Sequence, residues 1–315
     1  MQNNTKGRPA AVGRVGTLVL CLLGAAWLSG MAGCSTLAGL GRRVVPAGSG
    51  PQKRVLLARF VNQSLLRDAD TGGSIEKNMA AALADACRGV VWINPGDPDY
   101  PFLMGDLPEQ VARGALDNLE MAQMGRQLGL NAIITPRLVS IEAREERGGL
   151  PGFRGPRYKL RIVMGASVFD TETGAKLLEE RFSEARKIDD TLFEEIRTAK
   201  IADTGELAAA LDREMKTVGE KVCEALAASP WKGFVVAVEG DKIILSAGEN
   251  AGVQPGMTFS VYASGPVIAG TQGQRFRMQG EKTGEIRVTA VFPAKSEAVL
   301  ISGPPVAVGD TVRRR

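Results

Sequence analysis

Carboxylates are the residues that could do acid–base or metal chemistry in this sequence, because histidine is absent. Its absence excludes a histidine-dependent catalytic triad, a histidine-ligated zinc site and a c-type haem. Asp68 and Asp70 open a segment, residues 68–76, that partly matches a calcium-binding loop. Met79 stands where such a loop has its bidentate Glu, and without that carboxylate the match predicts a polar turn before a helix rather than a metal site.

Asp97 and Asp99 form a second carboxylate pair, which flanks Pro98 in a proline-rich segment. Paired carboxylates need a cleft to do acid–base work, and this segment predicts a solvated loop. No phosphate-binding glycine loop is present, and aromatic residues make up only 5% of the chain, so no stacking platform for nucleic acid is expected. We therefore expect no enzyme, no catalytic residue, no cofactor, no metal and no nucleic-acid partner.

Two charged segments are expected to be solvated. The first is the mixed charge run formed by Glu142, Arg144, Glu145, Glu146 and Arg147. It predicts the exposed end of a strand or a loop. The second is the carboxy-terminal run Arg313–Arg315, which predicts a solvated tail, although three adjacent arginines could also contact lipid headgroups or peptidoglycan.

The amino terminus, residues 1–33, has the composition of a secretory signal. It carries basic and no acidic residues, then an apolar stretch from about residue 15 to 28 that is short for a membrane span. Ala32 and Gly33 directly precede Cys34, an ending that resembles the bacterial lipobox, with Met31 where Leu is usual. The alternative is an ordinary signal peptide, or an uncleaved anchor, followed by a chance cysteine.

The lipobox resemblance implies a lipid anchor on Cys34, with acyl chains such as palmitate and cleavage just before it. Because the next residue, Ser35, is not Asp, it also implies sorting to the outer membrane, facing the periplasm. Cleavage would leave 36 Lys and Arg against 35 Asp and Glu, so most of the formal charge of +4 belongs to the signal. A mature chain so close to neutral has no overall attraction for nucleic acid.

Cys87 and Cys223 are the two cysteines that remain once Cys21 leaves with the signal and Cys34 is acylated. Both fall near the ends of predicted helices, and the cell envelope permits disulfides. They are therefore a candidate disulfide, and the alternative is two inert buried thiols.

The pattern of strands and helices predicts an α+β protein: a mixed sheet covered by helices, followed by a small all-β, barrel-like domain. We divide the chain into a signal (1–33), a flexible tether (34–52), an α/β domain (53–229) and a β domain (230–315). In the first domain, strands are expected near 55–60, 90–93, 132–141, 158–170 and 175–187, and helices over 74–88, 106–128 and 205–228. In the second, strands are expected over 234–238, 242–245, 258–262, 284–291, 298–301 and 310–313.

Three stretches of the first domain resemble the domain shared by the TolB amino-terminal region and the curli-secretion lipoprotein CsgG. They are residues 55–64, 128–134 and 167–174, in that family's order. Residues 240–245, 251–257, 283–286 and 309–312 are similar to the carboxy-terminal domain of flagellar assembly protein T. That family has an additional amino-terminal domain, which residues 35–52 are too short to form, and it normally lacks a lipobox.

These resemblances imply a non-catalytic assembly or interaction module whose partners are envelope proteins, such as the flagellar basal body or cell-wall machinery. The resemblances leave open whether the protein forms a homo-oligomer. One alternative is a curli-type secretion channel, which needs membrane-spanning hairpins, whereas the insert Ala143–Arg157 is charged and rich in Gly and Pro. Another is an activator of cell-wall synthases. The sequence distinguishes neither the partner nor the pathway.

Overall fold

The computed structural model describes residues 50–64, 69–101, 110, 117–148, 155–200, 205–271 and 273–314. Cys34 and Asp68 lie outside these residues. No helix among them is long and apolar enough to cross a membrane. The described chain contains a mixed sheet with helices and a closed barrel of six antiparallel strands, which confirms the expected α+β class.

The sheet has the strand order β3-β1-β4-β5-β6, with the short β2 paired to β4. The parallel strands are β1 (Arg54–Leu57), β2 (Val61–Asn62) and β3 (Val91–Ile93), each pairing with a neighbour in the same direction. The antiparallel strands are β4 (Ala132–Gly148), β5 (Gly155–Asp170) and β6 (Lys176–Ile188). Every residue of β1 is buried, as expected for a central parallel strand covered on both faces.

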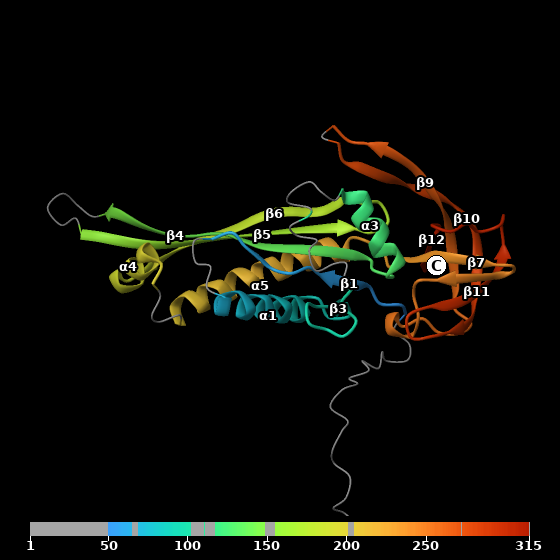
Figure 1. Ribbon diagram of the computed structural model, residues 1–315, viewed down its shortest axis with the longest axis horizontal. Helices are drawn as coiled ribbons and strands as arrows, with labels where there is room; N and C mark the ends of the chain where they lie inside the picture. Colours follow the sequence, from blue (N-terminus) through green and yellow to red (C-terminus); the bar gives the residue numbers. More distant parts are fainter. Residues whose placement is uncertain are drawn as a thin grey trace, which may run out of the picture. The chain divides into compact units, whose positions relative to one another are not determined.

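Three helices cover one face of the sheet (Figure 1): α1 (Ala69–Ala86), α4 (Asp190–Thr198) and α5 (Gly205–Ala227). Alternate residues of β5, from Leu160 to Val168, face these helices, as their apolar spacing predicted. The main core therefore lies between this face and the apolar stripes of α1 and α5.

A single described helix, α3 (Asn118–Gln127), packs on the opposite face of the sheet, at the end near the barrel (Figure 1). Its Met121 joins Leu56, Ile133 and Phe169 in a second, smaller core. Asp117 caps this helix by accepting a hydrogen bond from the backbone N–H of Glu120 at 2.7 Å. The rest of this sheet face, beyond α3, is not covered by any other helix that the structure describes.

The barrel follows α5 and closes in the order β10-β11-β8-β7-β12-β9. Its strands are β7 (Gly233–Glu239), β8 (Lys242–Leu245), β9 (Thr258–Ala269), β10 (Arg275–Val291), β11 (Ser296–Ser302) and β12 (Thr311–Arg314). A one-turn 3-10 helix, η2 (Glu249–Ala251), lies between β8 and β9. The barrel core contains Trp231, Phe259 and Val261.

Several elements differ from the expected ones. Helix α1 begins by Ala69, ahead of the expected Ser74, so the segment that partly matches a calcium loop is helical from that residue onward. Helix α4 was not expected at all, and β2 lies where the sequence indicated a turn. β9 and β10 are also much longer than expected, because polar and glycine-containing segments pair with each other beyond the apolar strand cores.

Candidate functional site

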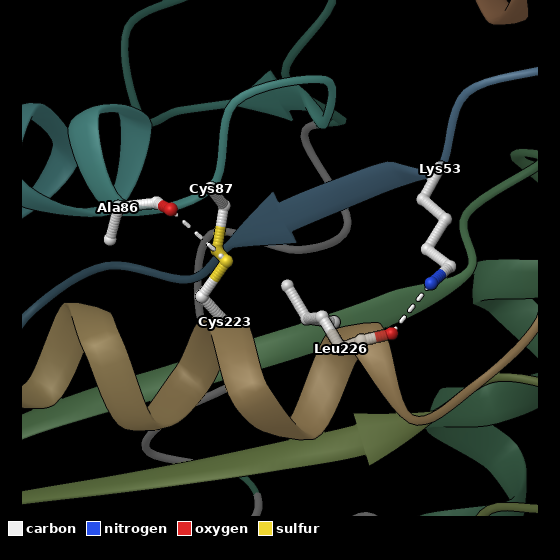
Figure 2. The surroundings of a disulfide bond; sticks show 5 residues. All are labelled: Lys53, Ala86, Cys87, Cys223 and Leu226. Atoms are coloured by element: carbon white, nitrogen blue, oxygen red, sulfur yellow. Dashed lines mark hydrogen bonds between the residues drawn. A yellow bond between two sulfur atoms is a disulfide. The ribbon is translucent and has the colours of Figure 1, made fainter.

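Cys87 and Cys223 lie together in the structure and are joined as a disulfide (Figure 2). Cys87 directly follows α1, Cys223 is in the last third of α5, and their Cα atoms are 5.3 Å apart. Gly219 permits this approach, because a Cβ atom there would lie only 3.0 Å from the carbonyl oxygen of Ala82. The bond therefore ties together the two long helices that cover the sheet.

Asp97 and Asp99 are both exposed, as the sequence predicted. Asp97 accepts a hydrogen bond from the backbone N–H of Asn94 at 2.8 Å and so closes a local turn. Among the described residues, no group of three or more Cys, Asp or Glu side chains is arranged to hold a metal ion.

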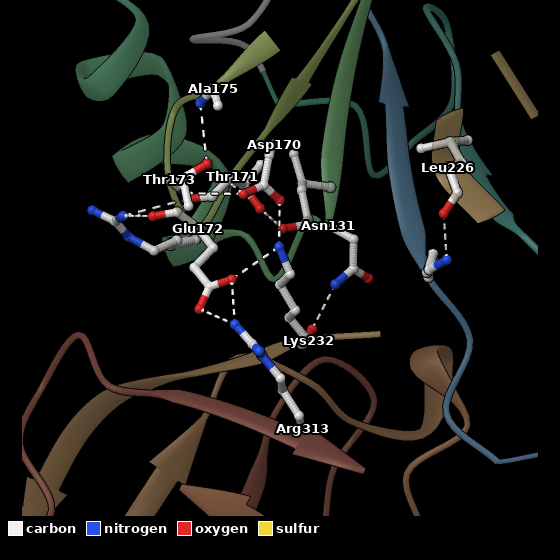
Figure 3. A network of polar contacts seen from close by, with 12 residues as sticks. Asn131, Asp170, Thr171, Glu172, Thr173, Ala175, Leu226, Lys232 and Arg313 are labelled. Atoms are coloured by element: carbon white, nitrogen blue, oxygen red, sulfur yellow. Dashed lines mark hydrogen bonds and ion pairs between the residues drawn. The ribbon is translucent and has the colours of Figure 1, made fainter. Parts of the chain in front are cut away.

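The most conspicuous cluster of buried charges lies where the sheet meets the barrel (Figure 3). Lys232, directly before β7, places its ammonium 2.6 Å from Asp170 and 2.9 Å from Glu172. All three side chains are at most 5% exposed. Both carboxylates belong to the turn that follows β5, so this ion pair crosses from the sheet to the barrel.

Arg313 of β12 adds a second bond across this joint. Its guanidinium nitrogen Nη2 donates to both carboxylate oxygens of Glu172, at 2.7 and 2.8 Å. The same guanidinium lies over the ring of Tyr262, 4.6 Å from its centre. The expectation of a solvated tail is therefore wrong for Arg313, because Glu172 lies within reach of its side chain and holds it.

The sheet side of the joint is held in shape by its own turn. Asp170 accepts hydrogen bonds from the backbone N–H of Thr173 at 3.0 Å and from its hydroxyl at 2.7 Å. Gly174 completes the turn with φ +76°, a conformation that favours glycine. Arg126 of α3 donates to the carbonyl oxygen of Glu172 at 2.8 Å, so this turn is fixed from a third element.

Asn131 connects the start of the sheet to the barrel. Its side-chain oxygen accepts from the backbone N–H of Arg54 at 3.1 Å, and its Nδ2 donates to the carbonyl oxygen of Lys232 at 2.7 Å. Gly129, with φ +68°, is close by, and a Cβ atom there would lie 1.9 Å from the carbonyl oxygen of Ser246. Only glycine allows the α3–β4 turn to approach the barrel this closely.

The pKa of Arg126 reflects its position in this joint. Burial lowers that pKa, Arg277 lowers it further, and Glu172 and Asp170 act in the opposite direction. A buried charge without a partner is costly, and here every buried cation faces a carboxylate or a carbonyl oxygen. The arrangement is that of a structural joint, in which the charges neutralise one another across the contact.

A second contact joins the β9–β10 hairpin to α3. The Arg275 side chain forms ion pairs with Asp117 and Glu120 in the first turn of α3. Asn118 donates from Nδ2 to the carbonyl oxygen of Arg275 at 2.6 Å and accepts from its backbone N–H at 3.2 Å. Sheet and barrel are therefore also held together away from the joint, and they belong to one compact unit.

The sheet face that carries α3 is strongly basic over β4, β5 and β6. Residues opposite each other across antiparallel strands share a face, so the strand register identifies its members. We call this surface the basic face. Its charged residues are the cations Arg137, Arg144, Arg157, Lys159, Arg161, Lys176, Arg181 and Lys187 and the carboxylates Glu142, Glu146 and Glu179.

Neither the joint nor the basic face is predicted from the sequence. The turn at residues 170–174 and the charge run in β4 are, but nothing in the sequence indicates that Lys232 and Arg313 meet that turn. No local pattern marks contacts between residues as far apart as Asp170 and Lys232. The basic face could have been found in part from the sequence, because the alternate β5 residues Arg157, Lys159 and Arg161 are all basic.

Comparison with known proteins finds no matching family model and no matching curated protein. Among solved structures, the chain is similar to the hypothetical protein CT253 from Chlamydia trachomatis (10% identity, TM-score 0.37, covering 56% of this chain and 99% of that one). It is also similar to lipoprotein GNA1162 from Neisseria meningitidis (14% identity, TM-score 0.28, covering 50% of this chain and 99% of that one). A third similar structure is the PelC dodecamer from Paraburkholderia phytofirmans (14% identity, TM-score 0.29, covering 55% of this chain and 91% of that one). These sequence identities and TM-scores are too low for a role or a partner of the three proteins to be transferred to this chain.

Proposed function

We propose that this protein is an outer-membrane lipoprotein that faces the periplasm and acts as a non-catalytic assembly or interaction module. The signal-like amino terminus ending in Ala32-Gly33-Cys34 supports the lipid anchor. Acyl chains contribute about 0.8 kcal/mol per buried methylene, so a multiply acylated cysteine would hold the protein stably at a membrane.

The observation that carries the proposal is the buried joint between sheet and barrel. Catalytic carboxylates and lysines are usually found in clefts, where a substrate can reach them. Here Asp170, Glu172 and Lys232 are buried and neutralise one another, so they are arranged to hold two domains together. A rigid pair of domains presents a fixed surface to a partner, which is what an assembly module requires.

The flagellar basal body is the pathway that the sequence resemblance favours. An in-cell crosslinking pull-down tests it: the wild-type protein should recover basal-body proteins, whereas the unacylated Cys34→Ser variant should not. Recovery of cell-wall synthases instead would reject the flagellar assignment. Turnover of a small substrate by the pure protein, abolished by one point substitution, would reject the non-catalytic role itself.

A further inference from the structure

The basic face contrasts with the rest of the chain. It carries eight cations and three carboxylates, whereas the whole sequence is nearly balanced, with 39 Lys and Arg against 35 Asp and Glu. The rest of the sequence has 31 Lys and Arg against 32 Asp and Glu, so it is almost neutral. Such an asymmetry creates a local positive potential that a protein of low net charge otherwise lacks.

Part of this charge is not used within the protein. Glu146 pairs with Lys159 at 2.6 Å and Glu142 with Arg144 at 2.8 Å, whereas Arg157, Arg181 and Lys187 form no side-chain hydrogen bond or ion pair with other described residues. All three are exposed. Their charges are available to an external anion.

The basic face contains a depression of about 320 Å³. Arg137 and Arg181 flank Gly165 in the strand register, and the Arg137 side chain lies over this glycine, where a Cβ atom would come within 2.7 Å of its Nε. Arg137 donates to the hydroxyl of the buried Ser167 at 3.3 Å. The lining also includes Val61, Pro136 and Phe169. Glu179 pairs with Lys176 and lies 3.7 Å from Arg137, which leaves Arg181 as the cation of this depression that no described residue pairs.

The chemistry of the surface identifies the kind of partner. Protein interfaces usually contain buried aromatic or large aliphatic anchors. Over β4 to β6 the apolar side chains of this face are few and separate: Val163 and Ala185 lie between charged and polar residues, and Leu177, beside Lys176, is 38% exposed. A largely cationic surface suits an array of anions, and clusters of four to eight Lys and Arg bind anionic lipid headgroups.

We propose that the basic face of β4–β6 docks on anionic phospholipid headgroups through Arg157, Arg181 and Lys187, whose charges no described residue pairs. Docking would lay this sheet face on the membrane and turn α1 and α5, on its other side, toward the surrounding space. The contact does not depend on the lipid anchor. The docking proposal, which goes beyond the proposed function, can therefore fail while that function stands, and the proposed function can fail while docking stands.

A chain from Ser35 to Arg315 tests the proposal, because it contains every described residue and lacks both the signal and the acylated cysteine. Co-sedimentation with vesicles of phosphatidylcholine and phosphatidylglycerol in equal parts should show binding, and vesicles of phosphatidylcholine alone should not. Binding should be lost at about 0.5 M salt, where charges are screened over a few ångström.

Two triple variants with equal changes in charge provide the matched control. The first variant reverses three charges of the basic face, with Arg157→Glu, Arg181→Glu and Lys187→Glu. It should lower the partition of the protein onto anionic vesicles at least about tenfold. The second variant changes exposed residues of α1 and α5 on the other side of the sheet, with Lys77→Glu, Arg213→Glu and Lys216→Glu. It should leave the partition of the protein onto the vesicles nearly unchanged. Unchanged melting temperatures would show that both variants fold.

The proposal is wrong if the wild-type chain ignores anionic vesicles or if both triple variants lose binding equally. It is also wrong if soluble polyglutamate binds the basic face while the vesicles do not, because the partner would then be an acidic polypeptide rather than a membrane.

Discussion

Glu214 is the carboxylate whose environment most clearly opposes its charge. It is buried between α5 and β6, where burial raises its pKa above 4.5 and the nearby carboxylate of Glu184 raises it further. Since the folded state holds this proton more tightly than the unfolded state, Glu214 carries no charge penalty below about pH 4.5, and the penalty grows as the pH rises from there through its folded pKa.

Glu214→Gln should therefore raise the melting temperature at pH 7 by a few degrees, since it removes the cost of a buried charge. The gain should shrink as the pH is lowered toward 4.5. Thermal melts across this pH range measure the effect, and Glu220→Gln, an exposed change on the same helix, is the control. A gain that is equal at all pH values would show that charge is not the cause.

Lys232 is the residue on which the joint between sheet and barrel depends most. Lys232→Met would leave Asp170 without its cation, and breaking a buried ion pair in this way costs about 3–5 kcal/mol. Lys242→Met removes an exposed pair with Glu297 and should cost about 0–1 kcal/mol. Urea unfolding of both variants gives the comparison, and equal losses would contradict the structural role of Lys232.

Among the elements, α1 and α5 depend on a covalent link as well as on packing. The Cys87–Cys223 bond joins residues 136 positions apart, and in the chain-entropy model such a link stabilises the fold by about 5 kcal/mol. The Cys87→Ala and Cys223→Ala double variant should melt at a clearly lower temperature in non-reducing buffer. Peptide mapping of the wild-type protein without reductant should recover the linked peptides, and two free thiols would refute the bond.

Elements with a strong apolar period could be predicted from the sequence, and those shaped by distant contacts could not. The apolar stripe from Leu207 to Leu226 predicted the bounds of α5 almost to the residue. The alternation of apolar and other residues over 160–168 predicted strand β5. Helix α4 has only Leu192 and Ile196 fully buried, which is too short a stripe to stand out. The outer parts of β9 and β10 are largely polar and form strands because they pair with each other.

The same distinction applies to the candidate sites. Cys87 and Cys223 could be named as a candidate pair, since only two cysteines remained, but the sequence left two free thiols as the alternative. The joint could not be predicted, because Asp170 and Glu172 are far in sequence from Lys232 and Arg313, and each looks like an ordinary surface charge until the two domains meet.

At the scale of the whole molecule, the sheet and the barrel should not behave as separable parts. The sequence alone suggests that removing residues 231–315 leaves a folded first domain that no longer joins its complex. The structure changes this expectation, because the truncation also removes the cations that face Asp170 and Glu172. The truncated protein should unfold at a lower urea concentration than the full chain. A transition at the same midpoint would show that the joint contributes little.

The proposed anchor at Cys34 would make the whole molecule a lipoprotein, and one measurement tests it directly. Mass spectrometry of the mature protein, purified from sedimented outer membranes, should find an amino-terminal peptide that begins at an acylated Cys34. The Cys34→Ser variant should appear as a soluble or unprocessed form. A mature wild-type protein that begins at another residue, or that begins at Cys34 without lipid, would contradict the account.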